Sequence, residues 1–299
     1  MTSFPLWAER LYNRPIALDR FKNETLCEFA DQRIFGARRD KIDATSLGQM
    51  QIASRSDEAS HYSDTGRKPF LHRGHIAVIP IRGTLVHRGG YVDAQSGLLG
   101  YNHIMEQARA AERDPDIKGK FVLFDSGGGE CAGMWAAAEE LATMTKAEGG
   151  KPMYAYLDDR ACSAAYVLCS VADKIYGRRE VMGGSIAAII NMVDKSKAME
   201  RMGLRPVAVR ASWADRKARG GYGEAFDDEL VAKAETMVEE ASEMIVEVVS
   251  AMRGIKPQAV RDLRGEVFTG EDLVSFGLMD GIASEQEAWA MLEREIANA

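Results

Sequence analysis

Short, continuous runs of apolar residues alternate with amphipathic or alanine-rich stretches through the middle of the chain. The stretches predict helices over residues 101–113, 134–148 and 163–172, and the runs between them predict strands: HIAVIPIRG, KGKFVLFDSGGG, PMYAYL and KIYG. Strands that are apolar on both faces are typical of a parallel sheet covered by helices on both sides. We therefore expect an α/β fold.

A longer helix is predicted over residues 226–253. Apolar side chains recur there every three, four or seven residues, and Gly254 follows as a terminator. The predicted apolar face consists of Leu230, Ala234, Met237, Ala241, Met244, Val248 and Met252. The opposite face is acidic, and we expect it to face water.

Residues 1–69 differ from the rest of the chain. Much of this segment lacks sustained periodicity and is rich in Ser, Asp and Arg. We interpret it as an N-terminal arm and linker, followed by one domain over residues 70–299. Within the arm, residues 24–35 predict a short helix whose apolar face docks on the core or on a neighbouring subunit.

Composition and charge exclude several classes of protein. The 299 residues are 46% hydrophobic and 28% charged, which excludes a wholly disordered chain. The net charge of −7 disfavours a general binder of nucleic acid or of anionic membranes. Charged residues within the first twenty interrupt the apolar core that a signal peptide needs. No run reaches the ~18 apolar residues of a membrane-spanning helix. We expect a soluble, cytoplasmic protein.

The four cysteines, Cys27, Cys131, Cys162 and Cys169, are scattered along the chain. They show neither a C-x-x-C pair nor the Cys/His spacing of a zinc site. This pattern indicates free thiols in a reducing compartment and gives no reason to expect a bound metal or other cofactor.

Three glycines, Gly127, Gly128 and Gly129, directly follow the strand FVLFD, and Gly133 precedes the next helix. Such glycines let backbone N–H groups approach a ligand, and a following helix N-terminus favours negative charge. An oxyanion or a phosphate fits this pattern. The dinucleotide and phosphate-loop fingerprints are absent, which disfavours a nucleotide. The alternative is a tight turn without a ligand.

Ser163 follows the strand PMYAYL and opens an alanine-rich helix. Its hydroxyl could simply cap that helix. However, ligands gather at the carboxyl ends of strands in α/β sheets, which favours a nucleophile here. The N–H of Ala164 would then point toward the developing oxyanion.

A nucleophilic serine needs a base. All five histidines precede Ser163, and a G-x-S-x-G motif is absent, so a Ser-His-Asp triad is disfavoured. A lysine is the remaining option, provided that burial keeps it neutral near pH 7. One candidate for this base is Lys217, in a glycine-rich stretch, and the alternative candidates are Lys195 and Lys197. Most such lysines are surface residues.

Five separated segments resemble the signal peptide peptidase A family of serine peptidases: HIAVIPIRGTL, FVLFDSGGGECAGM, ACSAAYVLCSVADKIYG, VMGGSIAA and GEVFTGEDLVSFGLMDGI. They occur in that family's order over about residues 70–290. The resemblance implies a ClpP/crotonase-like fold and a Ser-Lys dyad. The N-terminal RLYNRPIALD and the missing membrane anchor are similar to the phage branch, the capsid assembly (prohead) proteases.

The resemblance also implies roles for individual residues. Ser163, in C-S-A-A-Y, matches the family's nucleophile, although alanines replace the glycines that usually follow it. Gly128 and Ala164 match the oxyanion-hole donors. Ser185, in G-G-S-I, matches the serine that hydrogen-bonds the lysine, and Lys217 matches the base.

The implied activity is that of a serine endopeptidase acting on proteins or peptides, including capsid or scaffold proteins during phage capsid maturation. A homo-oligomer is expected, with the arm helix and residues 226–253 as candidate contacts. Two alternatives remain open. One is a crotonase-like enzyme that acts on acyl-CoA substrates, and the other is a capsid assembly factor with a degenerate dyad.

Overall fold

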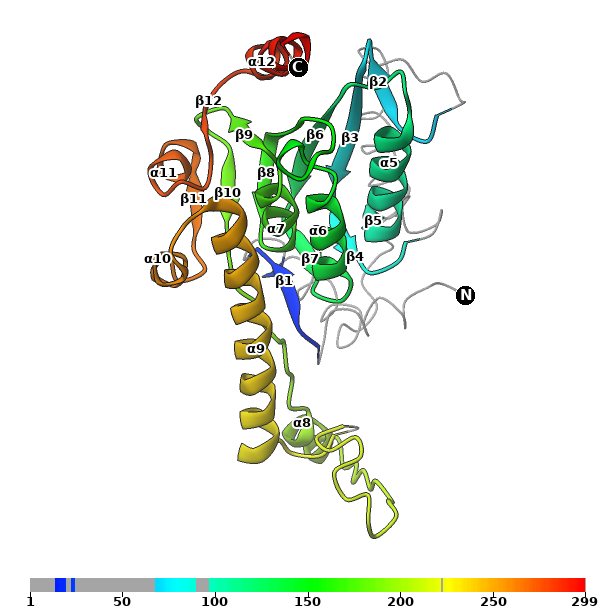
Figure 1. The fold of residues 1–299 in the computed structure, drawn as a ribbon. Helices are drawn as coiled ribbons and strands as arrows, with labels where there is room; N and C mark the ends of the chain where they lie inside the picture. The colour runs from blue at the N-terminus through cyan, green and yellow to red at the C-terminus, as the bar shows by residue number, and fades with distance from the viewer. Residues whose placement is uncertain (1–13, 20–22, 25–67, 90–96, 222, 299) are drawn as a thin grey trace, which may run out of the picture.

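The computed structural model describes residues 14–19, 23–24, 68–89, 97–221 and 223–298. An eight-stranded sheet lies at its centre (Figure 1). Its main path runs β11-β10-β8-β6-β3-β2, and β9 and β12 extend it beside β8. The strands are β2 (Leu71–Arg73), β3 (Ile76–Arg82), β6 (Gly119–Ser126), β8 (Met153–Cys162), β9 (Lys174–Gly177), β10 (Met182–Gly184), β11 (Val267–Thr269) and β12 (Gly281–Ile282). The central pairs are parallel, and β2 and β11 are antiparallel to their neighbours.

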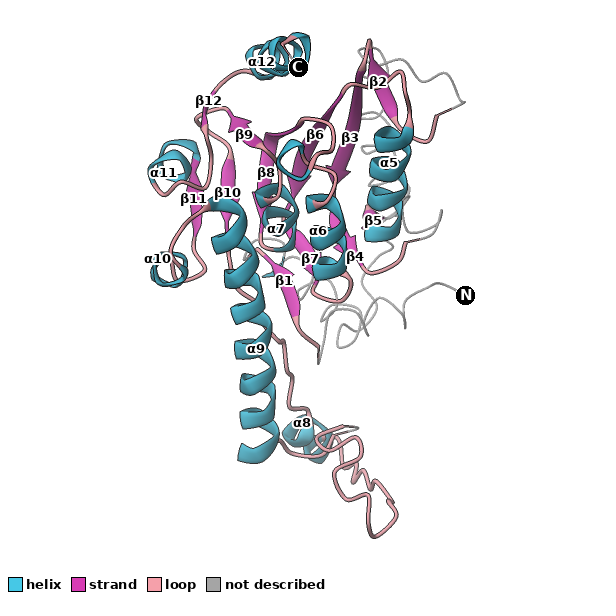
Figure 2. Ribbon diagram, in the orientation of Figure 1, coloured by secondary structure: helices cyan, strands magenta, loops and turns pink. Residues whose placement is uncertain are grey.

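Alternate side chains of β6 enter different hydrophobic clusters on the two faces of the sheet. Val122 and Phe124 join a cluster with α5 (Tyr101–Arg113), α6 (Met134–Ala142) and α7 (Ala164–Ser170). Phe121 and Leu123 pack with residues of α12 (Glu285–Ala297) on the other face. Figure 2 shows α5, α6 and α7 side by side over the sheet. The predicted α/β fold, a parallel sheet flanked by helices, is confirmed.

A second, four-stranded sheet has the order β1-β7-β4-β5. Its strands are β1 (Ile16–Leu18), β7 (Gly128–Glu130), β4 (Thr84–Val86) and β5 (Leu98–Gly100). Because β4 follows β3 and β7 follows β6 almost directly, this sheet lies at the carboxyl edge of the central sheet. Residues 16–18 of the predicted arm are therefore part of the folded body. The division at residue 69 stays a prediction, and residues 25–35 of the predicted arm helix lie outside the described residues.

The helix predicted over residues 134–148 is shorter than expected. It ends at Ala142, and a separate 3₁₀ turn covers Lys146–Glu148. The hydroxyl of Thr145 donates to the Ala142 carbonyl at 2.8 Å, and the Asp173 carboxylate accepts from the Lys146 N–H at 3.0 Å. These side-chain hydrogen bonds take the place of the backbone N–H to C=O hydrogen bonds that a continuous helix would need.

The long helix, α9, spans Asp228–Arg253. The Asp227 carboxylate caps its first turn, and Gly254, with φ of 64°, ends it. The predicted apolar face was wrong in part, because Met237, Met244 and Met252 are exposed, whereas Ala241 is buried and Val248 packs against the core. The side chains that α9 buries are Ala241, Ile245, Val246 and Val249. Only its C-terminal half therefore packs on the core, whereas its N-terminal half projects away (Figure 1).

Within the described residues, no helix is both long and apolar enough to cross a membrane. Three of the four cysteines, Cys131, Cys162 and Cys169, fall in these ranges, and each is a buried free thiol.

Lys120 is a fully buried cation near the amino end of β6. Its ammonium group donates to the Glu112 carboxylate of α5 and to the Met144 carbonyl. Burial lowers the pKa of Lys120, and the hydrogen bond to Glu112 only partly opposes this shift. The carboxylate therefore compensates a charge that the core would otherwise penalise.

We expect Glu112→Ala to lower the free energy of unfolding by about 3 kcal/mol, because it leaves the buried ammonium without its carboxylate. Lys120→Met should change this free energy by less than about 1 kcal/mol, because it removes the buried charge itself. Urea unfolding of both variants measures the difference. Equal losses in the two variants would contradict this account of the pair.

Candidate active site

Ser163 lies where β8 ends and α7 begins, in a strained backbone conformation. Its φ is 54° and its ψ is −122°, a region that residues with a side chain rarely adopt. Such strain costs on the order of 1–3 kcal/mol and persists only where the surroundings hold it. The strained strand-to-helix turn of α/β-hydrolases presents a nucleophilic serine in a similar way, although the G-x-S-x-G motif is absent here.

Three hydrogen bonds hold this turn. The Ser163 N–H donates to the Gly184 carbonyl at 2.8 Å, and the Ser163 carbonyl accepts from the Val167 N–H at 3.0 Å. The Ser163 hydroxyl donates to the Ala187 carbonyl at 3.2 Å. Gly184 ends β10 and Ala187 follows it three residues later, so the end of β10 fixes the backbone of Ser163 and the segment after it fixes the hydroxyl.

Ser185 directly follows β10, just as Ser163 directly follows β8. The two strands pair in parallel with Gly184 opposite Cys162, so both serines directly follow paired residues at the carboxyl edge. Ser185 also has a positive φ, of 52°, and its N–H donates to the Glu266 carbonyl at 2.7 Å. The structure therefore brings the two predicted serines together.

The two predicted oxyanion donors lie beside the nucleophile. Gly128 has a φ of 98°, and a methyl group on it would lie 2.9 Å from the Cys162 carbonyl oxygen and 3.1 Å from the Ala164 nitrogen. Only glycine allows this approach. Ala164 is the first residue of α7, where N–H groups have no acceptor within the helix. The Gly128 N–H donates to the Ser126 hydroxyl at 3.2 Å.

Lys217 lies far from these residues. It is exposed, in the turns between α8 (Ser196–Arg201) and α9. Figure 1 shows these turns at the end of α9 farthest from α7. The site adjoins the other half of α9, where the Ser242 hydroxyl accepts from the Ala188 N–H at 3.0 Å. From Ser242 back to Asp228 the helix rises roughly 21 Å, which exceeds the reach of a lysine side chain.

The alternative lysines, Lys195 and Lys197, do not reach the nucleophile either. Lys195 precedes α8 and Lys197 lies within it. This short helix lies beside the same projecting end of α9, since the Asp194 carboxylate accepts from the Phe226 N–H at 3.0 Å. Within one chain, none of the three lysines considered as the base is placed to take a proton from Ser163.

A charged cluster at the same edge was not predicted. Arg160 lies 3.5 Å from the Asp19 carboxylate and 3.9 Å from that of Asp125. Burial, reinforced by Asp159, raises the pKa of Asp125. The D-D-R run before Ser163 was visible in the sequence, but its partners come from β6 and from the N-terminal segment.

Cys162, next to Ser163, is a poor candidate for a nucleophile. Burial raises the pKa of its thiol to about 12, so the thiol stays protonated near neutral pH and is a poor nucleophile. Within the described ranges, no group of three or more His, Cys, Asp or Glu side chains is arranged to hold a metal ion. Ser163 therefore stays the predicted nucleophile at this edge.

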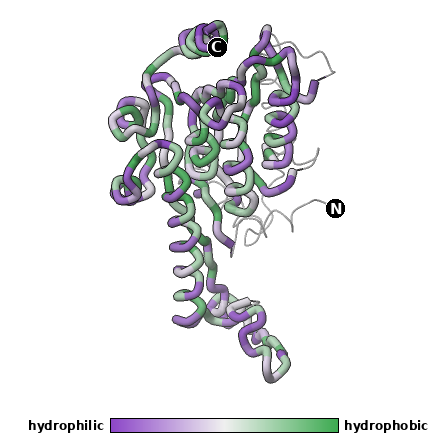
Figure 3. The backbone as a smooth tube through the Cα atoms, in the orientation of Figure 1, coloured by the Kyte–Doolittle hydropathy of each residue, from purple (hydrophilic) through white to green (hydrophobic). Residues whose placement is uncertain are grey.

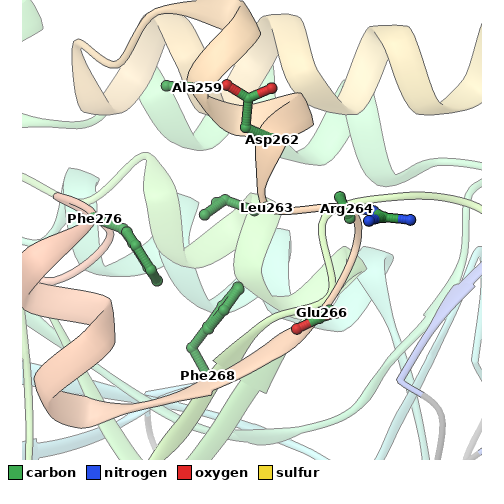
Figure 4. A pocket seen from close by; sticks show the side chains of 7 residues that line it. All are labelled: Ala259, Asp262, Leu263, Arg264, Glu266, Phe268 and Phe276. Carbon is green, nitrogen blue, oxygen red and sulfur yellow. The ribbon is translucent and has the colours of Figure 1, made fainter.

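A pocket of about 350 Å³ lies between the segment 259–268 and Phe276 (Figure 4). Leu263, Phe268 and Phe276 give it an apolar lining, with the two phenyl rings edge to face. Glu266 lines this pocket and also contacts the site, because its carbonyl accepts the hydrogen bond from the Ser185 N–H. None of the residues predicted for catalysis lines this pocket.

Residues 145–298 match the family model for peptidase family S49. The match covers just over half of the chain and includes Ser163, Ser185 and Lys217. The chain belongs to peptidase family S49. The resemblance to the signal peptide peptidase A family predicted from five motifs is thereby confirmed.

Two phage proteins align with nearly all of this S49 family member. Capsid assembly protease C of Escherichia phage lambda is 25% identical over 290 residues, or 96% of this chain and 65% of that protein. Head-tail preconnector protein GP5 of Enterobacteria phage P21 is 28% identical over 282 residues, 91% of this chain and 55% of that protein. The chain spans less than two thirds of the length of either relative.

Other relatives and solved structures are more distant. A putative signal peptide peptidase SppA of Enterococcus faecium is 26% identical over 198 residues, 65% of this chain and 56% of that protein. A peptidase from Plasmodium falciparum superimposes on 70% of this chain and 96% of its own, with a TM-score of 0.41 and 12% identity. A ClpP1 variant from Listeria monocytogenes covers 71% of this chain and 93% of its own, with a TM-score of 0.42 and 7% identity.

The strain at Ser163 predicts an unusual order of stabilities. Ser163→Ala and Ser163→Gly both lose the hydroxyl, but only glycine adopts this φ and ψ without strain. We expect the glycine variant to have the higher free energy of unfolding, by about 1 kcal/mol. At Ser170, within the helical backbone of α7, the order should reverse, with alanine better than glycine by about 0.5–1 kcal/mol. Urea unfolding of the four variants measures both differences, and the same order at both positions would exclude strain at Ser163.

Proposed function

We propose that this chain is a serine endopeptidase whose nucleophile is Ser163. The observation that carries the proposal is the strained turn at Ser163, held by the carbonyls of Gly184 and Ala187 beside two backbone donors. A backbone strain of this kind clusters at active sites, because folding alone gives no reason to keep it. Membership of peptidase family S49 supports the same reaction class.

The proposed reaction proceeds through an acyl-enzyme. A neutral lysine takes the proton of the Ser163 hydroxyl, and Oγ attacks the carbonyl carbon of the scissile peptide bond. The N–H groups of Gly128 and Ala164 then stabilise the oxyanion, a contribution of about 3 kcal/mol per donor. Gly128 gives up its long bond to Ser126 for this purpose. The lysine returns the proton to the leaving amine, and water hydrolyses the ester.

We assign the base to Lys217 of a second copy of the chain. Burial at an interface favours the neutral form of a lysine, which is the form that the reaction needs. Apolar and polar residues are interspersed along the segment that carries Lys217 (Figure 3). Its exposed apolar residues are Met202, Leu204, Val207, Val209 and Trp213, with Trp213 exposed by 87%. Such a patch is typical of a protein interface. Ser185, beside Ser163, would hold the incoming lysine.

The proposed substrates are proteins that assemble or mature with a phage capsid. The relatives that align with almost the whole chain are named for capsid assembly and for the head-tail preconnector. Incubation with candidate capsid and scaffold proteins, followed by mass spectrometry, tests this substrate class. Wild type should generate new termini that Ser163→Ala does not. Equal cleavage by both proteins would contradict the assignment of Ser163.

The assignment of Lys217 to a second copy predicts complementation between two inactive variants. Ser163→Ala lacks the nucleophile and Lys217→Ala lacks the base, so each homogeneous assembly should be inactive. In a mixture, some sites combine the Ser163 of one copy with the Lys217 of another. With equal amounts and random exchange, activity should reach about a quarter of wild type. A mixture as inactive as its components, despite verified subunit exchange, would exclude a base supplied in trans.

A further inference from the structure

The strand β1 occupies a slot between two edges of backbone. On one side it pairs antiparallel with β7, in the register Ile16 to Glu130, Ala17 to Gly129 and Leu18 to Gly128. On the other side, Ile16 and Ile189 exchange two hydrogen bonds of 2.9 Å, one in each direction. The three-residue strand is therefore paired along its whole length on one edge and through Ile16 on the other edge, as a bound peptide strand would be.

Both edges of this slot belong to the candidate active site. Gly128 is a proposed oxyanion donor, and Ala187, two residues before Ile189, accepts the hydrogen bond of the Ser163 hydroxyl. A methyl group on Gly128 would lie 2.1 Å from the Ala17 carbonyl oxygen and 3.1 Å from the Ala164 nitrogen. The backbone of β1 thus passes directly beside the two donors.

The nucleophile is closed off in this arrangement. Ser163 has no exposed surface, and Ile16, Ala17 and Leu18 are also buried. A substrate carbonyl can reach the Ser163 hydroxyl only after a neighbouring segment moves. Among the described elements beside Gly128, β1 is short and reaches the slot from a distant part of the sequence, so it can leave without breaking the central sheet.

The residue after β1 fastens the strand at its carboxyl end. The Asp19 N–H donates to the Gly127 carbonyl at 2.8 Å. The Asp19 carboxylate, 1% exposed, lies 3.5 Å from the guanidinium of Arg160. The contact between Asp19 and Arg160 therefore holds the N-terminal segment over the site, which gives the charged cluster beside Ser163 a structural role.

We propose that the slot between β7 and Ile189 is a binding site for an extended peptide, and that residues 16–18 of the chain itself occupy it. This inference rests on the proposed peptidase function. A substrate strand then binds only when β1 is displaced. A tethered segment competes at an effective concentration on the order of millimolar, so it lowers the apparent affinity for free peptides.

A binding experiment tests the proposal without relying on catalysis. In a Ser163→Ala background, Ile16→Pro removes the N–H that donates to Ile189, whereas Ile16→Val keeps it and serves as the matched control. The probe is a fluorescein-labelled hexapeptide of residues 14–19, RPIALD, followed by fluorescence anisotropy. We expect the proline variant to bind this peptide at least tenfold more tightly than the valine variant, and a scrambled hexapeptide to bind to neither. Equal affinities, or binding of the scrambled peptide, would overturn the proposal.

A second variant covers the case in which Ile16→Pro does not fold, as judged by circular dichroism. Asp19→Ala leaves the strand pairing intact and removes the contact with Arg160, so it should also tighten binding of the hexapeptide, by several fold. Unchanged affinity in Asp19→Ala would then overturn the proposal.

An activity measurement separates this proposal from the proposed function. With Ser163 present, Ile16→Pro should raise kcat/KM on a casein peptide several fold through a lower KM, and free RPIALD should inhibit it competitively. Loss of all Ser163-dependent cleavage in both the proline and valine variants, with hexapeptide binding retained, would reject the peptidase function alone. Cleavage with no change between these variants would reject the occupied slot alone.

Discussion

The hydrogen bond from the Ser163 N–H to the Gly184 carbonyl joins two parallel strands at the point where both leave the sheet. The pairing of β8 with β10 places Cys162 opposite Gly184, so the serines that follow lie side by side. The same segment after β10 supplies the carbonyl that accepts the Ser163 hydroxyl. The strained φ of Ser163, the position of Ala164 at the start of α7 and the approach of Gly128 all depend on this junction. Its strain is maintained by a core that is buried on both faces of the sheet.

In the two proposals, the carboxyl edge of the sheet has two functions that compete with each other. The donors of Gly128 and Ala164 need an open approach for a peptide carbonyl, yet β1 fills the space beside Gly128. Backbone pairing makes this occupation possible, because an extended segment can complete an exposed strand edge, and the buried side chains of Ile16, Ala17 and Leu18 determine which sequence fits. In these proposals, access to Ser163 depends on a segment that is distant in sequence, and the base comes from another segment that projects away from the chain's own site.

The order of strands and helices could be predicted from the sequence because continuous apolar runs such as FVLF identify strands buried on both faces. Ser163, Gly128 and Ala164 could be selected because each directly follows or begins a predicted element, whereas Ser185 was identified only through the resemblance to the family. The full buried face of α9 could not be predicted, since Met237 and Ile245 are both apolar and packing of the C-terminal half against α7 buries only Ile245. The strand Ile16–Leu18 was missed because three apolar residues are too few to show a period, and its partners lie over a hundred residues away. The distance of Lys217 from Ser163 also required the structure, because motif order does not reveal whether two motifs meet within one chain.

The most direct test of the central claim, that the folded edge of the sheet makes Ser163 a nucleophile, is site-mapped labelling with a fluorophosphonate. The assembled protein and the same protein in urea are treated with the reagent, and peptide mass spectrometry locates the adduct. The account predicts that Ser163 carries the adduct in the folded protein and that the adduct is absent in urea. Modification of other serines to the same extent as Ser163, or equal modification of Ser163 in urea, would contradict it.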